Sequence, residues 1–434
     1  MTRNIILLTV DALRADHVSW HGYERNTTPL LEEFSKRCTV FESAYAASSH
    51  TRESVPSLLT GRHPTDAVGD GFTRGAETLP MLLPDEYATA AFHSNPYVSR
   101  AYSYDEGFDT FYDNLRIGQN KILALVQRAL DKFVLSRGQY HARAEEINSR
   151  ALSWLSSLSE IQPFFLWNHY MDVHGPYNPP EGFTKWSDTV SNTEAQRLYD
   201  TLSGDESPTE EEIELSKNLY DGEIRYVDAQ IGQFINAIKT RGLLEESLVI
   251  ITSDHGDLFG EYGRYAHPRY VYPELTKVPL IISGPDIASA AVSVPASTYD
   301  IGPTVLDAAS RQNVCLPGQT LASPEQINEY RPVFSSATGE GTDDCVRRFA
   351  VQTTKRGVRF TRNQTTGDIT EEGCYLLPSG EVVDSSTNSE FESLRTALIK
   401  HSDMSLNKIS TANGDAAVPS NADIKERLEA LGYK

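Results

Sequence analysis

Short, uninterrupted runs of hydrophobic residues recur along the chain, and segments with helical spacing of apolar residues separate them. Such runs are typical of strands that are buried on both faces of a parallel sheet. They lie at residues 4–10, 88–93, 163–170, 248–253 and 278–282. The alternation of strand and helix predicts an α/β fold with a large, mostly parallel central sheet flanked by helices.

Two longer segments interrupt this alternation. Residues 118–160 have helical periodicity, and 120–135 are amphipathic, which favours a helix that packs on the sheet or forms a lid. A helix lying on a membrane surface is the alternative. Residues 186–216 are polar, and we expect a surface insertion that leads into a helix at 210–238.

The C-terminal part of the chain has a different pattern. After a change of composition near 320–345, three stretches alternate like short antiparallel strands, and a helical segment follows at 424–431. The three stretches are 349–353, 357–361 and 375–377. We therefore expect a catalytic domain at 1–330 and a small α+β subdomain at 331–434.

Polar side chains follow several of the predicted strands. Asp11, the 93–95 segment, the 169–174 segment and the pair Asp254–His255 all lie where a strand ends. Ligands of open α/β sheets bind beyond the carboxyl ends of the strands, so these side chains are expected to share one site. An adjacent carboxylate and imidazole suit a divalent cation of intermediate hardness. A turn with a capping Asp is the alternative at each position, but the two strand ends together favour a metal site held by Asp11, Asp254 and His255.

Hydroxyl and imidazole groups in loops could supply the rest of such a site. Residues 48–62 form a polar loop that enters a short helix, whose N-terminus suits an oxyanion. Thr51 there could act as a metal-activated nucleophile, or it could simply cap the helix. His174 and His267 lie in loops, where they could donate to ester oxygens or to a leaving group.

The charge balance narrows the possible partners. The 434 residues include 39 basic and 60 acidic side chains, for a net charge of −21. So acidic a surface repels nucleic acid and anionic lipid, and it is typical of proteins that work in concentrated salt. No run approaches the roughly 20 apolar residues of a membrane span. No signal peptide is seen either, so a cytoplasmic protein is expected. The four cysteines are widely spaced and form no metal motif.

In chain order, these segments resemble the sulfatase family of the alkaline phosphatase superfamily. The resemblance covers nearly the whole chain and lies in 9–17 (TVDALRADH), 51–62 (TRESVPSLLTGR), 91–95 (AFHSN), 172–177 (DVHGPY), 253–256 (SDHG), 267–282 and 299–307 (YDIGPTVLD). It implies an alkaline-phosphatase-like layered fold. It also implies anion contacts by His93, Asn95, His174 and a residue of the 267–269 segment, either His267 or Arg269.

Three positions depart from the family pattern. Ala12 stands where relatives carry a second acidic ligand, and the usual Lys of the later segment is not clearly present. The family nucleophile is a Cys or Ser, converted to formylglycine, in a C/S-x-P-x-R pattern. Counting back from Arg62 places Thr51 at that position, with Val55 in place of the Arg. Because Thr cannot yield formylglycine, none is expected. The Thr51 segment also resembles the nucleophile segment of phosphoethanolamine and phosphoglycerol transferases.

These observations lead to one hypothesis. The chain is expected to hydrolyse sulfate or phosphate esters through Thr51, with one cation (Mn²⁺, Mg²⁺, Ca²⁺ or Zn²⁺). Its substrate would be an anionic ester, either a small molecule or one linked to a glycan or lipid. The expected site residues are Thr51, His174 and His267 for catalysis, Asn95, His93 and Arg269 for substrate, and Asp11, Asp254 and His255 for the metal. The alternatives are a phospho-group transferase, a two-metal phosphodiesterase that uses Asp172, His174 and His267, and a binding protein without catalysis.

Overall fold

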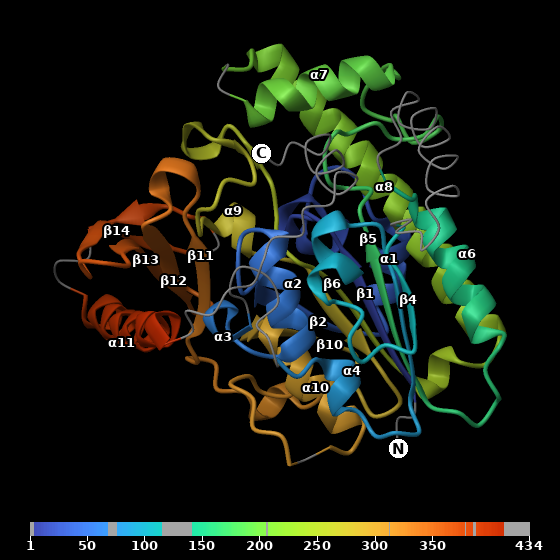
Figure 1. Ribbon diagram of the computed structural model, residues 1–434. Coiled ribbons are helices and arrows are strands. Elements are labelled where there is room, and N and C mark those ends of the chain that lie inside the picture. The colour runs from blue at the N-terminus through green and yellow to red at the C-terminus, as the bar shows by residue number, and fades with distance from the viewer. Residues whose placement is uncertain are drawn as a thin grey trace.

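The computed structural model describes residues 4–67, 76–114, 141–204, 207–311, 313–377, 379–384 and 388–411. An eight-stranded sheet forms the centre of the molecule, with strand order β10-β2-β9-β6-β1-β5-β3-β4 (Figure 1). Its strands are β1 (Asn4–Val10), β2 (Thr39–Tyr45), β3 (Ala88–Phe92), β4 (Thr110–Tyr112), β5 (Phe164–Tyr170), β6 (Ser247–Ser253), β9 (Leu280–Ser283) and β10 (Ala290–Ser297).

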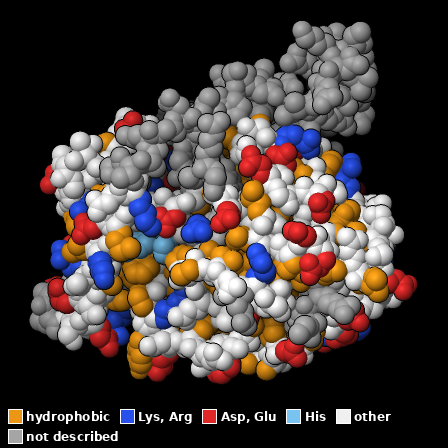
Figure 2. All heavy atoms as spheres, turned by 60° about the horizontal axis from the view of Figure 1, so that its bottom comes forward, with side chains coloured by type: hydrophobic (Ala, Val, Ile, Leu, Met, Phe, Trp, Pro, Cys, Tyr) orange, Lys and Arg blue, Asp and Glu red, His pale blue; other side chains and the backbone are white. Residues whose placement is uncertain are grey.

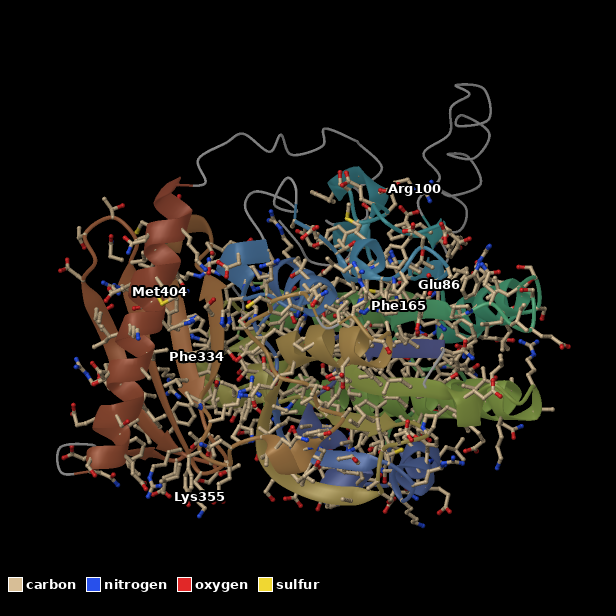
Figure 3. The ribbon with its side chains drawn as sticks, turned by 90° about the horizontal axis from the view of Figure 1, so that it is seen from below. Glu86, Arg100, Phe165, Phe334, Lys355 and Met404 are labelled. Atoms are coloured by element: carbon tan, nitrogen blue, oxygen red, sulfur yellow. The ribbon has the colours of Figure 1, made fainter. Side chains whose placement is uncertain are left out.

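Strand β1 shows why hydrophobic runs build this sheet. All seven of its residues are buried. Successive side chains of a strand point to opposite faces, and both faces of this sheet are covered. Ile6 and Leu8 therefore belong to one core cluster, whereas Ile5 and Leu7 belong to the other. Figure 3 shows Phe165 of the neighbouring β5 within this sheet.

Helices cover the two faces of the sheet. One face packs against α1 (Pro29–Ser35), α6 (Ala144–Leu155) and α8 (Glu210–Thr240). The other face packs against α2 (Thr51–Thr60), α4 (Leu79–Leu82) and α10 (Ile301–Ala308). Helix α8 begins at a capping box, in which Thr209 and Glu212 satisfy each other's backbone N–H groups. The remaining short elements are α3 (Pro64–Ala67), α7 (Asn192–Ser203), α9 (Pro273–Thr276) and the hairpin of β7 (Leu258–Phe259) and β8 (Tyr265–Ala266).

A second, antiparallel sheet follows the first in the chain. It consists of β11 (Val333–Thr338), β12 (Val346–Gln352), β13 (Arg356–Asn363), β14 (Ile369–Leu376) and β15 (Val382–Val383), in that order. Helix α11 (Ser389–Thr411) packs on β12 and β13. Figure 3 shows Phe334 of β11 on the inner side of α11, whereas Met404 lies on the helix itself and is half exposed.

The structure confirms the predicted fold class and corrects some of its details. The run at 278–282 does form a strand, β9, but β9 is antiparallel to both β2 and β6, so the central sheet is mixed. Strands β2, β4 and β10 were not predicted. The polar insertion contains helix α7. The proposed amphipathic helix at 120–135 and the closing helix at 424–431 lie outside the described residues.

Candidate active site

Asp11 and Asp254 are neighbours because their strands pair in register. In the parallel pair β1–β6, Val10 lies opposite Ser253, so the next residue of each strand reaches the same edge of the sheet. Both carboxylates are completely buried. Oδ1 of Asp254 accepts hydrogen bonds from the backbone N–H groups of Ala12 at 3.2 Å and His255 at 3.0 Å. Ala12 has a φ of 56°, a left-handed conformation that turns the chain sharply after Asp11.

His255 completes the set of metal ligands expected from the sequence. Its Nε2 lies 3.6 Å from Oδ1 of Asp11 and 3.6 Å from Oδ2 of Asp254. Its Nδ1 donates to the carbonyl oxygen of Gly256 at 2.8 Å, which fixes the plane of the ring. The structure thus brings the three predicted ligands together.

Two further side chains contact Asp11. His169 of β5 lies opposite Thr9 of β1, and its Nε2 is 3.1 Å from Oδ2 of Asp11. The Asn95 side chain donates to the same oxygen at 2.9 Å, while its Oδ1 accepts from the backbone N–H of Tyr97. Asn95, expected to bind substrate, therefore orients Asp11 here. His169 lay in a segment noted in the sequence, but it was not among the expected ligands.

These donors fit a divalent cation. Among the described residues, ligand atoms of Asp11, His169 and Asp254 all lie within 4.8 Å of one another. Oδ1 of Asp11 and Oδ2 of Asp254 accept no hydrogen bond from any described residue, although both are buried. Burial and the nearby Asp11 raise the pKa of Asp254. Burial opposes ionisation of Asp11 too, but the hydrogen bond with His169 and the histidines around it hold its pKa below the ordinary value. A cation would offset the repulsion between these two carboxylates.

Thr51 lies beside this cluster. It is the first residue of α2 and is almost fully buried. Its Oγ1 is 3.2 Å from Nε2 of His255. The hydroxyl of Ser54, one turn along the helix, donates to the backbone carbonyl of Asp254. This hydrogen bond connects α2 to the loop that carries Asp254 and His255. A hydroxyl at a helix N-terminus beside a cation site is well placed for nucleophilic attack.

A pair of histidines lies beside His255. The ring centre of His267 is 5.1 Å from that of His255 and 4.8 Å from that of His174. Nδ1 of His267 lies 3.3 Å from Oδ1 of Asp257, and Tyr177 donates to the other oxygen of that carboxylate. Nδ1 of His174 donates to the carbonyl oxygen of Gly175 at 2.7 Å. Burial lowers the pKa of His174 to about 4, so this ring is neutral near pH 7. A carboxylate therefore orients the His267 ring, whereas a backbone carbonyl orients that of His174.

The other two predicted substrate contacts, His93 and Arg269, have neighbours outside the cluster of Asp11, Asp254 and His255. His93 is completely buried, and its ring packs near Phe111 and Trp167. Its two ring nitrogens form no hydrogen bond with the described residues. Arg269 donates to Glu340 at 2.8 Å. Substrate binding by His93 and Arg269 stays a prediction.

Asp172, considered for a second metal ion, belongs to a different cluster. Its Oδ1 lies 2.9 Å from Nε of Arg143, which also pairs with Glu223 at 2.9 Å. Burial raises the pKa of Glu223 to about 7. Arg143 thus pairs with Asp172, which is one of the three side chains considered for a second cation.

On the face shown in Figure 2, basic, acidic and hydrophobic side chains are interspersed, and histidine side chains reach the surface beside basic and hydrophobic ones. Among the described residues, no helix is both long enough and apolar enough to cross a membrane.

Comparison with known proteins identifies the family. The Sulfatase family model matches residues 3–310, so the chain belongs to the sulfatase family. It is therefore a sulfatase-type ester hydrolase. A relative, arylsulfatase K of Bos taurus, is 40% identical over 372 residues, which cover 77% of this chain and 66% of that protein.

Two solved structures share the fold. A protein bound to its substrate D-glucosamine-2-N,6-O-disulfate superposes with a TM-score of 0.70 at 17% identity, covering 96% of this chain and all of that one. The phosphonate monoester hydrolase of Agrobacterium radiobacter superposes with a TM-score of 0.69 at 17% identity, covering 94% of this chain and 96% of that one. Likeness at this level of identity shows the fold alone.

Proposed function

We propose that the chain is a metal-dependent hydrolase of sulfate or phosphate esters in which the Thr51 oxygen is the nucleophile. One observation carries the proposal: the Thr51 hydroxyl lies 3.2 Å from His255, which itself lies 3.6 Å from the two unpartnered carboxylate oxygens. Asp11, Asp254 and His255 would hold the cation, with His169 as a fourth candidate ligand. When bound, the cation supplies positive charge that favours the Thr51 alkoxide and neutralises an ester oxygen.

The proposed reaction has two steps, in which Thr51, His267 and Asp257 have separate roles. The Thr51 alkoxide, its proton lost to solvent, attacks the sulfur or phosphorus atom. A bond forms to Thr51 Oγ1, the bond to the leaving oxygen breaks, and His267 gives its proton to that oxygen. Asp257 holds the His267 ring for this transfer. Water then attacks the Thr51 ester, which releases sulfate or phosphate and restores the alkoxide, and His267 regains a proton from solvent.

The ester class can be determined with chromogenic substrates. A sulfate monoester, a phosphate monoester, a phosphate diester and a phosphonate monoester would be compared on the metal-loaded protein. Two variants at the nucleophile are matched: Thr51→Val keeps the shape but lacks the hydroxyl, whereas Thr51→Ser keeps the hydroxyl. We expect Thr51→Val to lose at least about 10³-fold in kcat/KM and Thr51→Ser to retain measurable turnover.

Two results would overturn this proposal. Equal activity of the wild type and Thr51→Val would show that another group attacks. Turnover that appears only when an alcohol acceptor is added would identify a transferase, which the resemblance of the Thr51 segment to transferases makes the second candidate.

A further inference from the structure

His50, the residue immediately before Thr51, has no role in the reaction outlined above. Its side chain is 5% exposed, and it stands at the N-cap position of α2. Its Nε2 accepts no hydrogen bond from any described residue. An imidazole nitrogen buried without a partner is costly to keep, so its position beside the nucleophile calls for an explanation.

The hydrogen bonds around His50 determine which ring nitrogen carries the proton. The Ser48 hydroxyl lies 3.2 Å from Oε2 of Glu53 and 3.4 Å from Nδ1 of His50. A hydroxyl has a single proton, and the carboxylate takes it because a carboxylate only accepts. Nδ1 of His50 must therefore donate to the Ser48 oxygen. In the neutral ring this leaves the lone pair on Nε2.

The surroundings of His50 keep it neutral. Burial is the main reason that its pKa lies well below the ordinary value for histidine. The charges of Arg269, His255, Arg52 and His267 act in the same direction. Two of these, His255 and His267, belong to the candidate active site, and Oγ1 of Thr51, the next residue in the chain, lies 3.2 Å from Nε2 of His255.

The C-terminal subdomain holds this arrangement in place. Arg347 of β12 donates to Oε1 of Glu53 at 2.9 Å, and the Thr338 hydroxyl donates to the same oxygen at 2.9 Å. Strand β11 also bonds to the loop before His50, since the backbone N–H of Ser336 donates to the carbonyl of Ala47 at 2.9 Å. Glu53 stands where the C/S-x-P-x-R pattern has Pro. The departure at Thr51 is thus accompanied by a carboxylate two residues on.

Hydrolysis of an ester on Thr51 requires a base that activates water. A formylglycine hydrate can expel sulfate from its own geminal diol, whereas an ester of Thr51 must be attacked by water. A neutral imidazole is a suitable base for that water. This inference therefore rests on the proposed function of Thr51.

We propose that His50 is the general base that releases the product from Thr51, and that Glu53 and Arg347 position it. In this step the water oxygen bonds to the sulfur or phosphorus atom while Nε2 of His50 takes one proton of the water. The bond to Thr51 Oγ1 breaks, and its electron pair stays on that oxygen as the alkoxide. His50 then loses its proton to solvent and His267 regains one from solvent, so the next cycle begins from the same state.

Pre-steady-state kinetics with a nitrophenyl ester test the proposal through His50→Gln. Formation of the Thr51 ester does not use His50, so the variant should still show a burst of about one nitrophenolate per active site. Steady-state turnover should fall by about 10²-fold or more. Mass spectrometry of the acid-quenched variant should find the sulfo or phospho group on the peptide that contains Thr51. Adding imidazole to His50→Gly should restore part of the slow step, which a purely structural role would not allow.

The controls separate the possible failures. His21→Gln changes a half-buried histidine outside the site and should behave like the wild type. Glu53→Gln should keep the burst and slow the steady state, because a positioning residue acts on the same step. A parallel loss of burst and steady state in His50→Gln, with no trapped ester and an unchanged melting temperature, would overturn the role of His50. If Thr51→Val were active and no variant trapped an ester, the proposed nucleophile itself would be wrong.

Discussion

His174 and His267, the pair beside His255, differ in how they are held, and this difference assigns their roles. His267 faces the Asp257 carboxylate, whereas His174 donates to a backbone carbonyl and has a pKa of about 4. The Asp257 carboxylate fixes the orientation of the His267 ring, which a general acid requires. His174 instead suits a neutral contact to an ester oxygen.

The loss in kcat caused by removing the His267 imidazole should depend on the leaving group of the ester. We expect His267→Gln to lose about 10²-fold or more in kcat on an alkyl ester, whose alkoxide needs a proton, but much less on a nitrophenyl ester. Paired measurements of kcat on the two esters check this, with His174→Gln as the comparison. Equal losses on both esters would mean that His267 only binds substrate.

The Asp254 carboxylate makes the link between metal and stability testable. In Asp254→Asn, Oδ1 can still accept from the N–H groups of Ala12 and His255, while the charge near Asp11 is gone. A ligand that binds only the folded state stabilises it by about 2.7 kcal/mol at a hundredfold excess over its Kd. We therefore expect chelation to lower the melting temperature of the wild type and to leave that of Asp254→Asn nearly unchanged. A wild type that melts identically with and without chelator would contradict a bound structural or catalytic cation.

At the scale of residues, the sequence was sufficient to assign side chains that follow a strand to the site, but not those inside a strand. Asp11, Asp254 and His255 could be placed together because side chains that follow parallel strands meet at one edge of the sheet. His169 lies opposite Thr9, and it can be placed beside Asp11 only once β5 is known to neighbour β1. Likewise, whether Asn95 faces a substrate or Asp11 depends on which atom its amide reaches, and no sequence pattern contains that distance.

At the scale of elements, helix α2 positions the nucleophile, and its far end packs against α10 through two glycines. Gly61 has a φ of 65° and ends α2 in the left-handed conformation. A Cβ on Gly302 would lie 2.5 Å from the Gly61 Cα. Backbone cannot yield as a flexible side chain can, so the two helices approach this closely only because both positions are glycine.

Gly302→Ala should therefore destabilise the protein by about 1–3 kcal/mol, the usual cost of overpacking. Gly284→Ala is the matched control, since its nearest contact is the flexible end of Ile287 at 3.2 Å. Urea unfolding of both variants gives the comparison. A Gly302→Ala protein as stable as the control would show that α2 and α10 can separate without cost.

Element types could be predicted from the sequence better than element directions. A run that is buried on both faces carries no alternation, so the run at 278–282 indicates a strand but does not reveal that β9 runs antiparallel to β2 and β6. Strand β10 escaped prediction for the opposite reason. It is partly exposed and contains Pro295, where its register with β2 shifts. Irregular edge strands of this kind have no strong hydrophobic signature.

At the scale of the whole molecule, the C-terminal subdomain contacts the helix that carries Thr51. It contacts the nucleophile helix through the Arg347–Glu53 pair, and its helix α11 packs on α3, the short helix that follows α2. There the rings of His63 and His401 lie 4.6 Å apart, and His401 stacks on Phe334 at 4.3 Å. Two histidines so close together, and mostly buried, cannot both be charged at little cost.

This histidine pair predicts acid sensitivity of the contact between α11 and the catalytic domain. Burial lowers the pKa of His63 to about 4 and also lowers that of His401. Because an unfolded histidine titrates near 6.5, the contribution of the pair to stability is complete above that pH and is lost as the pH falls toward about 4. We expect His401→Phe, which keeps a ring to stack on Phe334 but cannot be protonated, to reduce the fall in melting temperature between these two pH values. Carboxylates elsewhere in the molecule titrate in the same range. The quantity to compare is therefore the slope of melting temperature against pH, measured for the variant and for the wild type. Identical slopes would show that the acid sensitivity lies elsewhere in the molecule.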